Sequence, residues 1–167
     1  RRVLFRSQWL WKVHRMFNRI EDLGAPVVAA IQGFCLGGGC EYVLSAHYRI
    51  GAANIKIGLP ETKLGIFPGW GGTVRLSRLA GADVAIEWIA SGNQWKAEDA
   101  LKVGVLDGVA EPAQLREAAM RTLTQAIEGK LDWRARAAQK KGALKLSGPE
   151  LAMCFGGSKA FGAGQAD

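Results

Sequence analysis

A chain of 167 residues, 49% of them hydrophobic, is long enough to bury the core of one domain and too apolar for a disordered protein. Its apolar runs all fall short of the ~20 residues of a membrane span. Its three cysteines are Cys35, Cys40 and Cys154, and they form no C-x-x-C pair. This pattern argues against a disulfide framework and favours a reducing compartment. The formal net charge of +7 is compatible with an anionic partner, but much of it stands near the chain ends, where we interpret the basic residues as solvated: Arg1, Arg2, Arg6, Lys130, Arg134, Arg136, Lys140, Lys141 and Lys145.

The chain begins with a predicted amphipathic helix and a predicted buried strand. Apolar residues recur at helical spacing over residues 9–23, and Gly24 and Pro26 would end that helix. Residues 27–31 form a short apolar run rich in β-branched side chains, which predicts a strand buried on both faces. The basic start has no acid before Glu21. That pattern fits a mitochondrial leader or the edge of a larger protein, and we favour the edge.

Short helices and strands are predicted to alternate through the first two thirds of the chain. After a glycine stretch we expect a short helix at 40–46 and two strands, 48–52 and 55–57, around a turn. A turn-rich segment, 59–72, precedes predicted helices at 73–79, 84–90 and 97–103, a strand at 105–109 and a long helix at 112–127. From residue 132 basic and small residues dominate, and a last helix is predicted at 149–161. This order predicts an α/β fold with a helical tail.

The glycines of GFCLGGGCEYVL stand where the predicted strand gives way to the short helix. Two phosphate-binding patterns fail here, because no P-loop lysine follows and the third glycine of the dinucleotide fingerprint is absent. The first amides of a helix lack intrahelical acceptors, so the amide of Gly38 would be free to stabilise a developing oxyanion, with the Glu41 carboxylate one turn further on. The alternative is a tight turn in which Glu41 interacts only with the helix dipole.

A second carboxylate, Glu61, follows in GLPETKLG after the two predicted strands. That return is long enough to bring Glu61 beside Glu41, and two acids facing one pocket can divide acid and base roles on one water. The later cluster PGWGGT would add backbone amides, with Trp70 as an apolar wall, although each glycine cluster also has an interpretation as a plain turn. The two histidines, His14 and His47, have no metal-ligand spacing, and no metal site is predicted.

Three segments resemble the enoyl-CoA hydratase/isomerase (crotonase) family in order and spacing, over about residues 13–109: PVVAAIQGFCLGGGCE, IGLPETKLGIFPGWGGTVRL and ASG…AEDALKVGVLD. Within the family, the sequence is most similar to the hydratase part of multifunctional α subunits of fatty-acid oxidation, and GADVAIEWIASG and the tail AFGAGQAD look like the passage of such a subunit toward its dehydrogenase part. The resemblance implies the C-terminal part of a crotonase-like spiral of short strands and helices. It also implies a partial hydratase core at 1–128, followed at 129–167 by a helical tail and the start of a linker toward a dehydrogenase part that is absent here.

The resemblance further implies syn hydration of a trans-2-enoyl-CoA to a 3-hydroxyacyl-CoA, as in β-oxidation. Glu41 and Glu61 match the two catalytic glutamates, Gly38 matches one oxyanion donor, and Gly69 matches the glycine whose amide helps to hold the catalytic water. The substrate pocket would be lined by Leu36, Gly37, Pro60 and Trp70. The family's second oxyanion donor lies on a loop before the first helix, and RRVLFRSQ does not resemble that loop. We therefore expect little hydratase activity from these 167 residues alone.

Two other functions stay open beside hydration. A double-bond isomerase on the same scaffold can work with one carboxylate, so the presence of both favours hydratase. Some relatives bind RNA, but no aromatic–basic stacking motif is evident, and we expect no nucleic-acid partner. We expect an acyl-CoA thioester as substrate and no cofactor in this segment, since NAD would bind only the dehydrogenase part. We also expect an oligomer, with a thiolase subunit as one possible partner, and a bacterial cytoplasmic location or, in a eukaryote, the mitochondrial matrix.

Overall fold

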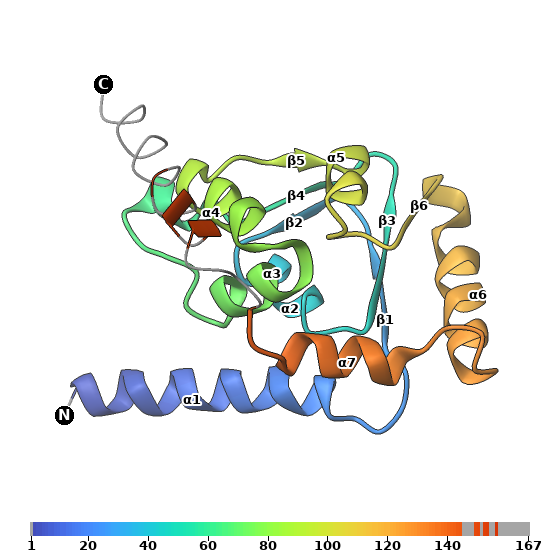
Figure 1. Cartoon of the computed structure of the whole chain (residues 1–167), viewed down its shortest axis with the longest axis horizontal. Coiled ribbons are helices and arrows are strands. Elements are labelled where there is room, and N and C mark those ends of the chain that lie inside the picture. The colour runs from blue at the N-terminus through green and yellow to red at the C-terminus, as the bar shows by residue number, and fades with distance from the viewer. Residues whose placement is uncertain (1, 145–148, 151, 154–155, 157–167) are drawn as a thin grey trace.

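A computed structural model describes residues 2–144, 149–150, 152–153 and 156. Short strands form two small sheets, and helices surround them (Figure 1). The predicted α/β class is therefore confirmed. The predicted helix at 149–161 lies largely outside the described residues, as do Lys145 and Cys154. In the described part of the chain, none of the helices combines the length and the hydropathy needed to cross a bilayer.

The first sheet is parallel and consists of β1 (Val28–Ile31), β3 (Tyr48–Ala52) and β6 (Gly108–Ala110), with β3 in the centre. Every residue of β3 is buried, as its central place in the sheet requires, and this includes the charged Arg49. β1 is an edge strand in the described part of the chain, and its residue Ala30 is exposed. The prediction that 27–31 is buried on both faces is therefore wrong, because β1 has a described neighbour strand on one side only.

The second sheet is formed by β2 (Phe34–Leu36), β4 (Lys56–Gly58) and β5 (Trp95–Lys96). β2 and β4 are parallel, and β4 and β5 are antiparallel. The two strands predicted at 48–52 and 55–57 both exist, but they belong to different sheets and do not pair with each other. β2 and β5 were not predicted, because strands of two or three residues carry too little periodicity to be recognised.

Most helices lie close to the predicted positions. They are α1 (Arg2–Glu21), α2 (Gly38–Val43), α3 (Gly72–Ala80), α4 (Ala82–Ser91), α5 (Ala97–Lys102), α6 (Leu115–Ile127) and α7 (Trp133–Lys141), with 3-10 turns at Pro60–Leu64 and Pro112–Gln114. The strand predicted at 105–109 is displaced to 108–110. α7 was not predicted because WRARAAQKK has no apolar stripe; its first turn is capped by Asp132, whose side chain accepts a hydrogen bond from the amide of Ala135.

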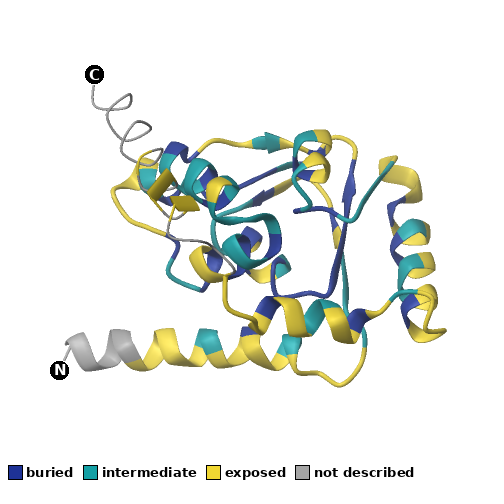
Figure 2. Ribbon diagram, in the orientation of Figure 1, coloured by how far each residue is buried: buried dark blue, intermediate teal, exposed yellow. Residues whose placement is uncertain are grey.

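The core lies between the sheets and the helices α2 to α5. Its fully buried side chains include Leu44, Ile57, Leu76 and Trp88, and the ring of Trp88 stacks on Trp95 with centroids 5.4 Å apart. α1 is largely exposed (Figure 2) and runs alongside α7 at the rim of this core (Figure 1). α7 begins after the predicted domain boundary at residue 128, and its Trp133 is buried against Tyr48.

Charged groups are buried beside this core as well. The guanidinium of Arg49 is fully buried; it donates to the carbonyls of Ala46 and Val105 and forms an ion pair with Asp107. Lys140 of α7 is 4% exposed. The interpretation of the C-terminal basic residues as solvated is therefore wrong for Lys140. A lysine is buried only where its ammonium group has hydrogen-bond acceptors. When the acceptors belong to a distant part of the chain, no local sequence pattern shows that the lysine is buried.

Candidate active site

A single residue of the glycine stretch, Gly37, connects β2 to α2. Gly37 has a φ of 56° and a ψ of −128°, a conformation that residues with a side chain rarely adopt, and its amide donates to Gly58 of β4. α2 then starts at Gly38, so the helix begins at the glycines rather than at Cys40 as predicted. The turn places Glu41 in the first turn of α2, on a side that points into the protein.

The carboxylate of Glu41 is fixed at the start of α3. Glu41 is 2% exposed, and its Oε1 accepts hydrogen bonds from the amides of Trp70 and Gly72, both at 2.8 Å. A Cβ added at Gly72 would lie 3.0 Å from Cγ of Glu41, so a glycine is needed for this close approach. The glycine cluster predicted to supply amides near the carboxylates thus supplies them to Glu41 itself.

Glu61 approaches the same region from the 3-10 turn Pro60–Leu64. It is 8% exposed, and its Oε2 is buried without a hydrogen-bond partner among the described residues. Burial raises the pKa of Glu61, and the charge of Glu41 raises it further. A Cβ added at Gly37 would lie 3.5 Å from Oε1 of Glu61. The second carboxyl group therefore lies over the β2–α2 turn, close enough to Glu41 for the two charges to interact.

Gly38 and Trp70 meet at the start of α2. The amide of Gly38, in the first helical position, donates to no acceptor in the described part of the chain. The Trp70 ring covers the Cα of Gly38 so closely that an added Cβ would lie 2.3 Å from a ring carbon. The ring of Trp70 in turn contacts Trp9 and Phe17 edge-on, with centroids 5.4 and 6.2 Å away. Trp70 is therefore an apolar wall beside the Gly38 amide.

The other residues named from the sequence lie around these two carboxyl groups. Leu36 ends β2 opposite Gly58 of β4, and Pro60 opens the turn that carries Glu61; both are half-buried. Gly69 directly precedes Trp70, and a Cβ added to it would meet only the Phe67 carbonyl, at 3.9 Å, so one side of Gly69 is open. The structure thus places the residues named from the sequence around the two carboxyl groups, but it does not show what any of them does.

The nearby thiols have no nucleophilic character. Burial raises the pKa of Cys35 to about 11, and burial also raises that of Cys40, with further contributions from Cys35 and from the carboxylates of Glu61 and Glu41. Both therefore stay protonated near neutral pH. Among the described residues, no group of three or more His, Cys, Asp or Glu side chains is arranged to hold a metal ion.

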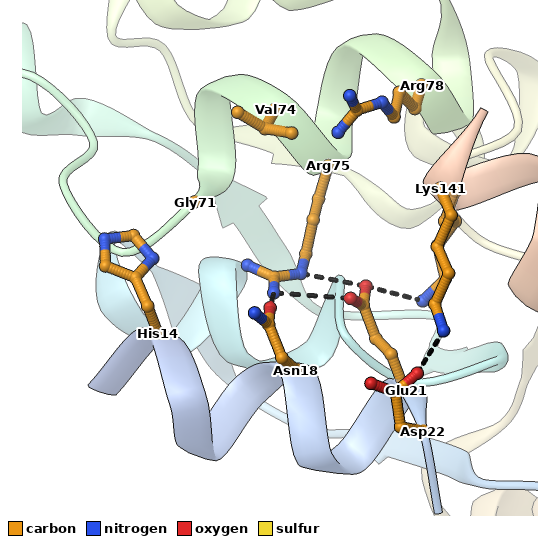
Figure 3. A pocket seen from close by; sticks show the side chains of 10 residues that line it. His14, Asn18, Glu21, Asp22, Gly71, Val74, Arg75, Arg78 and Lys141 are labelled. Atoms are coloured by element: carbon orange, nitrogen blue, oxygen red, sulfur yellow. Dashed lines mark hydrogen bonds and ion pairs between the residues drawn. The ribbon is translucent and has the colours of Figure 1, made fainter. Parts of the chain in front are cut away.

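Sequence reasoning missed the buried charges that support this region. Arg75 of α3 is 6% exposed and donates to the carbonyl of Trp70 and to the side chains of Asn18 and Glu21 on α1. Figure 3 shows the Arg75 side chain reaching from α3 toward these two residues. In the sequence, Arg75 occupies one position of a short predicted helix with ordinary polar neighbours, and no signal separates it from a solvated arginine.

Comparisons with known proteins agree on one family. The family model described as enoyl-CoA hydratase/isomerase matches residues 6–153. Among solved structures, an enoyl-CoA hydratase from Bacillus anthracis is 29% identical with a TM-score of 0.71, over 96% of this chain and 63% of the relative. DspI of Pseudomonas aeruginosa is 25% identical with a TM-score of 0.71, over 96% of this chain and 66% of the relative.

A further match, to a protein described as enoyl-CoA hydratase subunit I of Geobacillus kaustophilus HTA426, is 28% identical with a TM-score of 0.69. It covers 96% of this chain and 60% of the relative. The chain therefore spans about 60% of the length of such solved proteins, and the residues that match the family model include Glu41 and Glu61.

Proposed function

Because the chain belongs to the enoyl-CoA hydratase/isomerase family, we propose that it carries the hydratase centre of an enzyme that adds water to trans-2-enoyl-CoA thioesters. The fold is the crotonase-like α/β arrangement of short parallel strands and helices. The observation that carries the proposal is the pair of buried carboxyl groups. Glu41 is held by two amides, whereas Glu61 has a raised pKa and one buried oxygen without a hydrogen-bond partner among the described residues.

In the proposed reaction the two glutamates act on one water molecule. A base removes a proton from the water as its oxygen adds to the β-carbon, and an acid delivers a proton to the α-carbon. The raised pKa of Glu61 suits a group that holds a proton more readily than an ordinary carboxyl group does. The Gly38 amide would donate to the thioester oxygen as it gains enolate character, and the Gly69 amide would help to hold the water. Leu36, Gly37, Pro60 and Trp70 would line the acyl pocket.

We also propose a setting for this centre. The similarity of GADVAIEWIASG to multifunctional α subunits supports a role in β-oxidation, with residues 1–128 as part of the hydratase core and 129–167 leading toward a dehydrogenase part. An acyl-CoA would then be the substrate, this segment would need no cofactor, and NAD would bind only the dehydrogenase part. The partner in the assembled enzyme would be a thiolase subunit. The location would be the bacterial cytoplasm or the mitochondrial matrix.

The second candidate function is double-bond isomerisation on the same scaffold, which the free oxygen of Glu61 also suits because a carboxylate can shuttle one proton between two carbons. The two reactions differ in their need for Glu41 and Glu61. Hydration uses both carboxyl groups, whereas isomerisation can proceed with one. RNA binding has no structural feature in its favour.

Substitution of each glutamate by glutamine tests the proposal. We expect Glu41→Gln and Glu61→Gln each to lower turnover of crotonyl-CoA by about 10²–10³-fold, with a much smaller change in KM. The control is Glu98→Gln, an exposed carboxylate in the first turn of α5. Each variant is measured by loss of enoyl-CoA absorbance, in the chain itself and in the chain joined to the upstream region of a solved relative. Near-parental hydration by Glu61→Gln would exclude the hydratase role of Glu61.

A further inference from the structure

The ammonium group of Lys140 caps the end of α2, the helix that carries Gly38 and Glu41. Its Nζ donates to the carbonyl of the C-cap residue Leu44 and to those of the next two residues, Ser45 and Ala46, at 3.0, 2.9 and 2.8 Å. The final carbonyls of a helix have no intrahelical donor, and the helix dipole makes that end negative. A buried ammonium with three donors satisfies both requirements, although it comes from α7, about 95 residues later in the chain.

A single carboxylate joins this cap to α3. Oε1 of Glu21 lies 3.4 Å from Nζ of Lys140 and 2.9 Å from Nε of Arg75. All three side chains are at least nine-tenths buried. Figure 3 shows Glu21 facing Arg75 across the cleft between α1 and α3. Glu21 is thus the shared counter-charge of two cations that belong to different elements.

Arg75 continues the connection to the loop that holds Glu41. Its NH1 donates to the carbonyl of Trp70 at 3.1 Å, and the amide of the same Trp70 donates to Oε1 of Glu41. Glu41 is held by its own helix, α2, and by the 70–72 loop. Both of these segments are linked to Glu21: the end of α2 through Lys140, and the 70–72 loop through Arg75.

We propose that Lys140 and Glu21 are positioning residues for Glu41: together with Arg75 they fix the end of α2 and the 70–72 loop relative to each other, so that the Trp70 and Gly72 amides reach the Glu41 carboxylate. This inference rests on the proposed function for the role of Glu41, but the geometry that it predicts is measurable without any turnover. Neither positioning residue touches Glu41 itself; both act through backbone groups that do.

The charge on Lys140 has its own pH dependence. Burial lowers the pKa of Lys140 to about 8, against the opposing effect of Glu21 from α1. Arg49 from β3 and Arg75 from α3 lower it further, and His47 also faces Lys140, which lowers the pKa of His47. Deprotonation removes the positive charge that faces Glu21 and one of the three hydrogens that Lys140 offers to the carbonyls of Leu44, Ser45 and Ala46, of which Ala46 also accepts from Arg49. We expect the position of the 70–72 loop to shift with a midpoint near pH 8.

The test uses the amides that donate to Glu41 as reporters. In the 167-residue chain, Lys140→Met removes the ammonium and keeps the length of the side chain. We expect hydrogen exchange at the Trp70 and Gly72 amides to accelerate about 2–30-fold and their amide resonances to shift, while exchange at β3 amides changes little. The matched control is Lys141→Met, the neighbouring lysine, which is half-exposed and pairs with Asp22. It should leave both reporters unchanged.

A milder variant keeps the proposal falsifiable if Lys140→Met does not fold. Glu21→Gln retains the shape of the side chain and removes the charge shared by Arg75 and Lys140, and we expect the same reporters to change. Unaltered Trp70 and Gly72 amides in a folded Lys140→Met or Glu21→Gln chain would overturn the proposal. If these amides respond while Glu41→Gln leaves hydration intact, the positioning stands and the proposed function fails.

Discussion

At Gly38 the backbone and the Trp70 ring approach so closely that no side chain fits between them. The added Cβ would lie 2.3 Å from the ring, well inside any real carbon–carbon contact. The next residue, Gly39, has nothing within 4 Å of its added Cβ. Of these two adjacent glycines in the same helical turn, Gly38 has a steric reason to be glycine and Gly39 has none, which makes them a matched pair.

We predict that Gly38→Ala destabilises the fold by about 1–3 kcal/mol, because the methyl group must displace the Trp70 ring. Gly39→Ala should be neutral or stabilising by up to ~1 kcal/mol, since alanine favours a helix over glycine. Urea denaturation measures both. Equal effects in the two variants would show that Trp70 does not pack on Gly38 as described.

A second prediction concerns the buried oxygen of Glu61. Burial raises its pKa above the ordinary value of 4.5. A carboxyl group with a raised folded-state pKa binds more protons when folded than when unfolded between the two values, so it lowers stability as pH rises through that window. We therefore expect Glu61→Gln to stabilise the chain at pH 7 by on the order of 1 kcal/mol, because it removes a buried and unpaired charge.

This gain should vanish below pH 4.5, where the carboxyl group of Glu61 is protonated in both states. The measurement is thermal unfolding of wild type and variant from pH 4 to pH 8, with exposed Glu98→Gln as the control. A destabilised Glu61→Gln at pH 7 would mean that the carboxylate has a partner in solution that offsets its burial. If Glu61→Gln raises the stability of the folded chain and lowers turnover, the carboxyl group of Glu61 is retained for activity at the expense of stability.

Among the elements, β3 and β6 are joined by a buried charge pair rather than by apolar packing alone. Arg49 of β3 is fully buried, and Asp107, just before β6, accepts its side-chain and backbone hydrogen bonds. Asp107 also pairs with Arg136 of α7, so one carboxylate ties two elements to β3.

We predict that Asp107→Asn costs about 3 kcal/mol of stability, since it leaves the Arg49 guanidinium buried without its counter-charge. The control is Asp99→Asn, which breaks an exposed pair with Lys102 at 3.7 Å and should cost less than ~1 kcal/mol. Chemical denaturation of the two variants compares them directly. Similar losses would mean that solvent reaches Arg49.

The elements that could be predicted from sequence are those with a long local pattern. α6 and β3 have apolar residues at helical spacing or in a continuous run, and their predicted positions were close. α1 was also predicted from its apolar spacing, but it begins at Arg2, well before the predicted start at residue 9. β2, β5 and α7 were missed because each is short or lacks a stripe, and they form only where a neighbour offers pairing or a counter-charge. Glu41 and Glu61 were named from the sequence because glycine motifs flank them, and the structure buries both side chains close enough for their charges to interact.

The supporting charges could not be predicted in the same way. Arg75 and Lys140 are buried through contacts with segments tens of residues away, and nothing beside them in the sequence distinguishes them from surface cations. The same is true of Glu21, which stands at the end of a largely exposed helix. Local patterns report local structure, whereas these three residues are defined by tertiary contacts alone.

On the scale of the whole molecule, the chain corresponds to about 60% of a solved relative such as that from Geobacillus kaustophilus. Under the proposed function, Gly38 would supply one oxyanion donor, and the second would come from a part of such relatives that this chain does not span. We therefore predict that the 167 residues alone hydrate crotonyl-CoA about 10²–10³-fold more slowly than the same chain joined to the upstream region of a relative. Equal rates, measured by enoyl-CoA absorbance, would show that the second donor already lies within these residues.

The cap on α2 has a consequence for the order in which the protein is made. The carbonyl of Leu44 and the ammonium of Lys140 are 96 positions apart, so at about 5–20 residues per second a ribosome needs roughly ten seconds to synthesise the stretch between them. During that interval the helix bearing both Gly38 and Glu41 exists without its counter-charge. The proposed support of Glu41 is therefore completed only after the described strands of both small sheets have been synthesised.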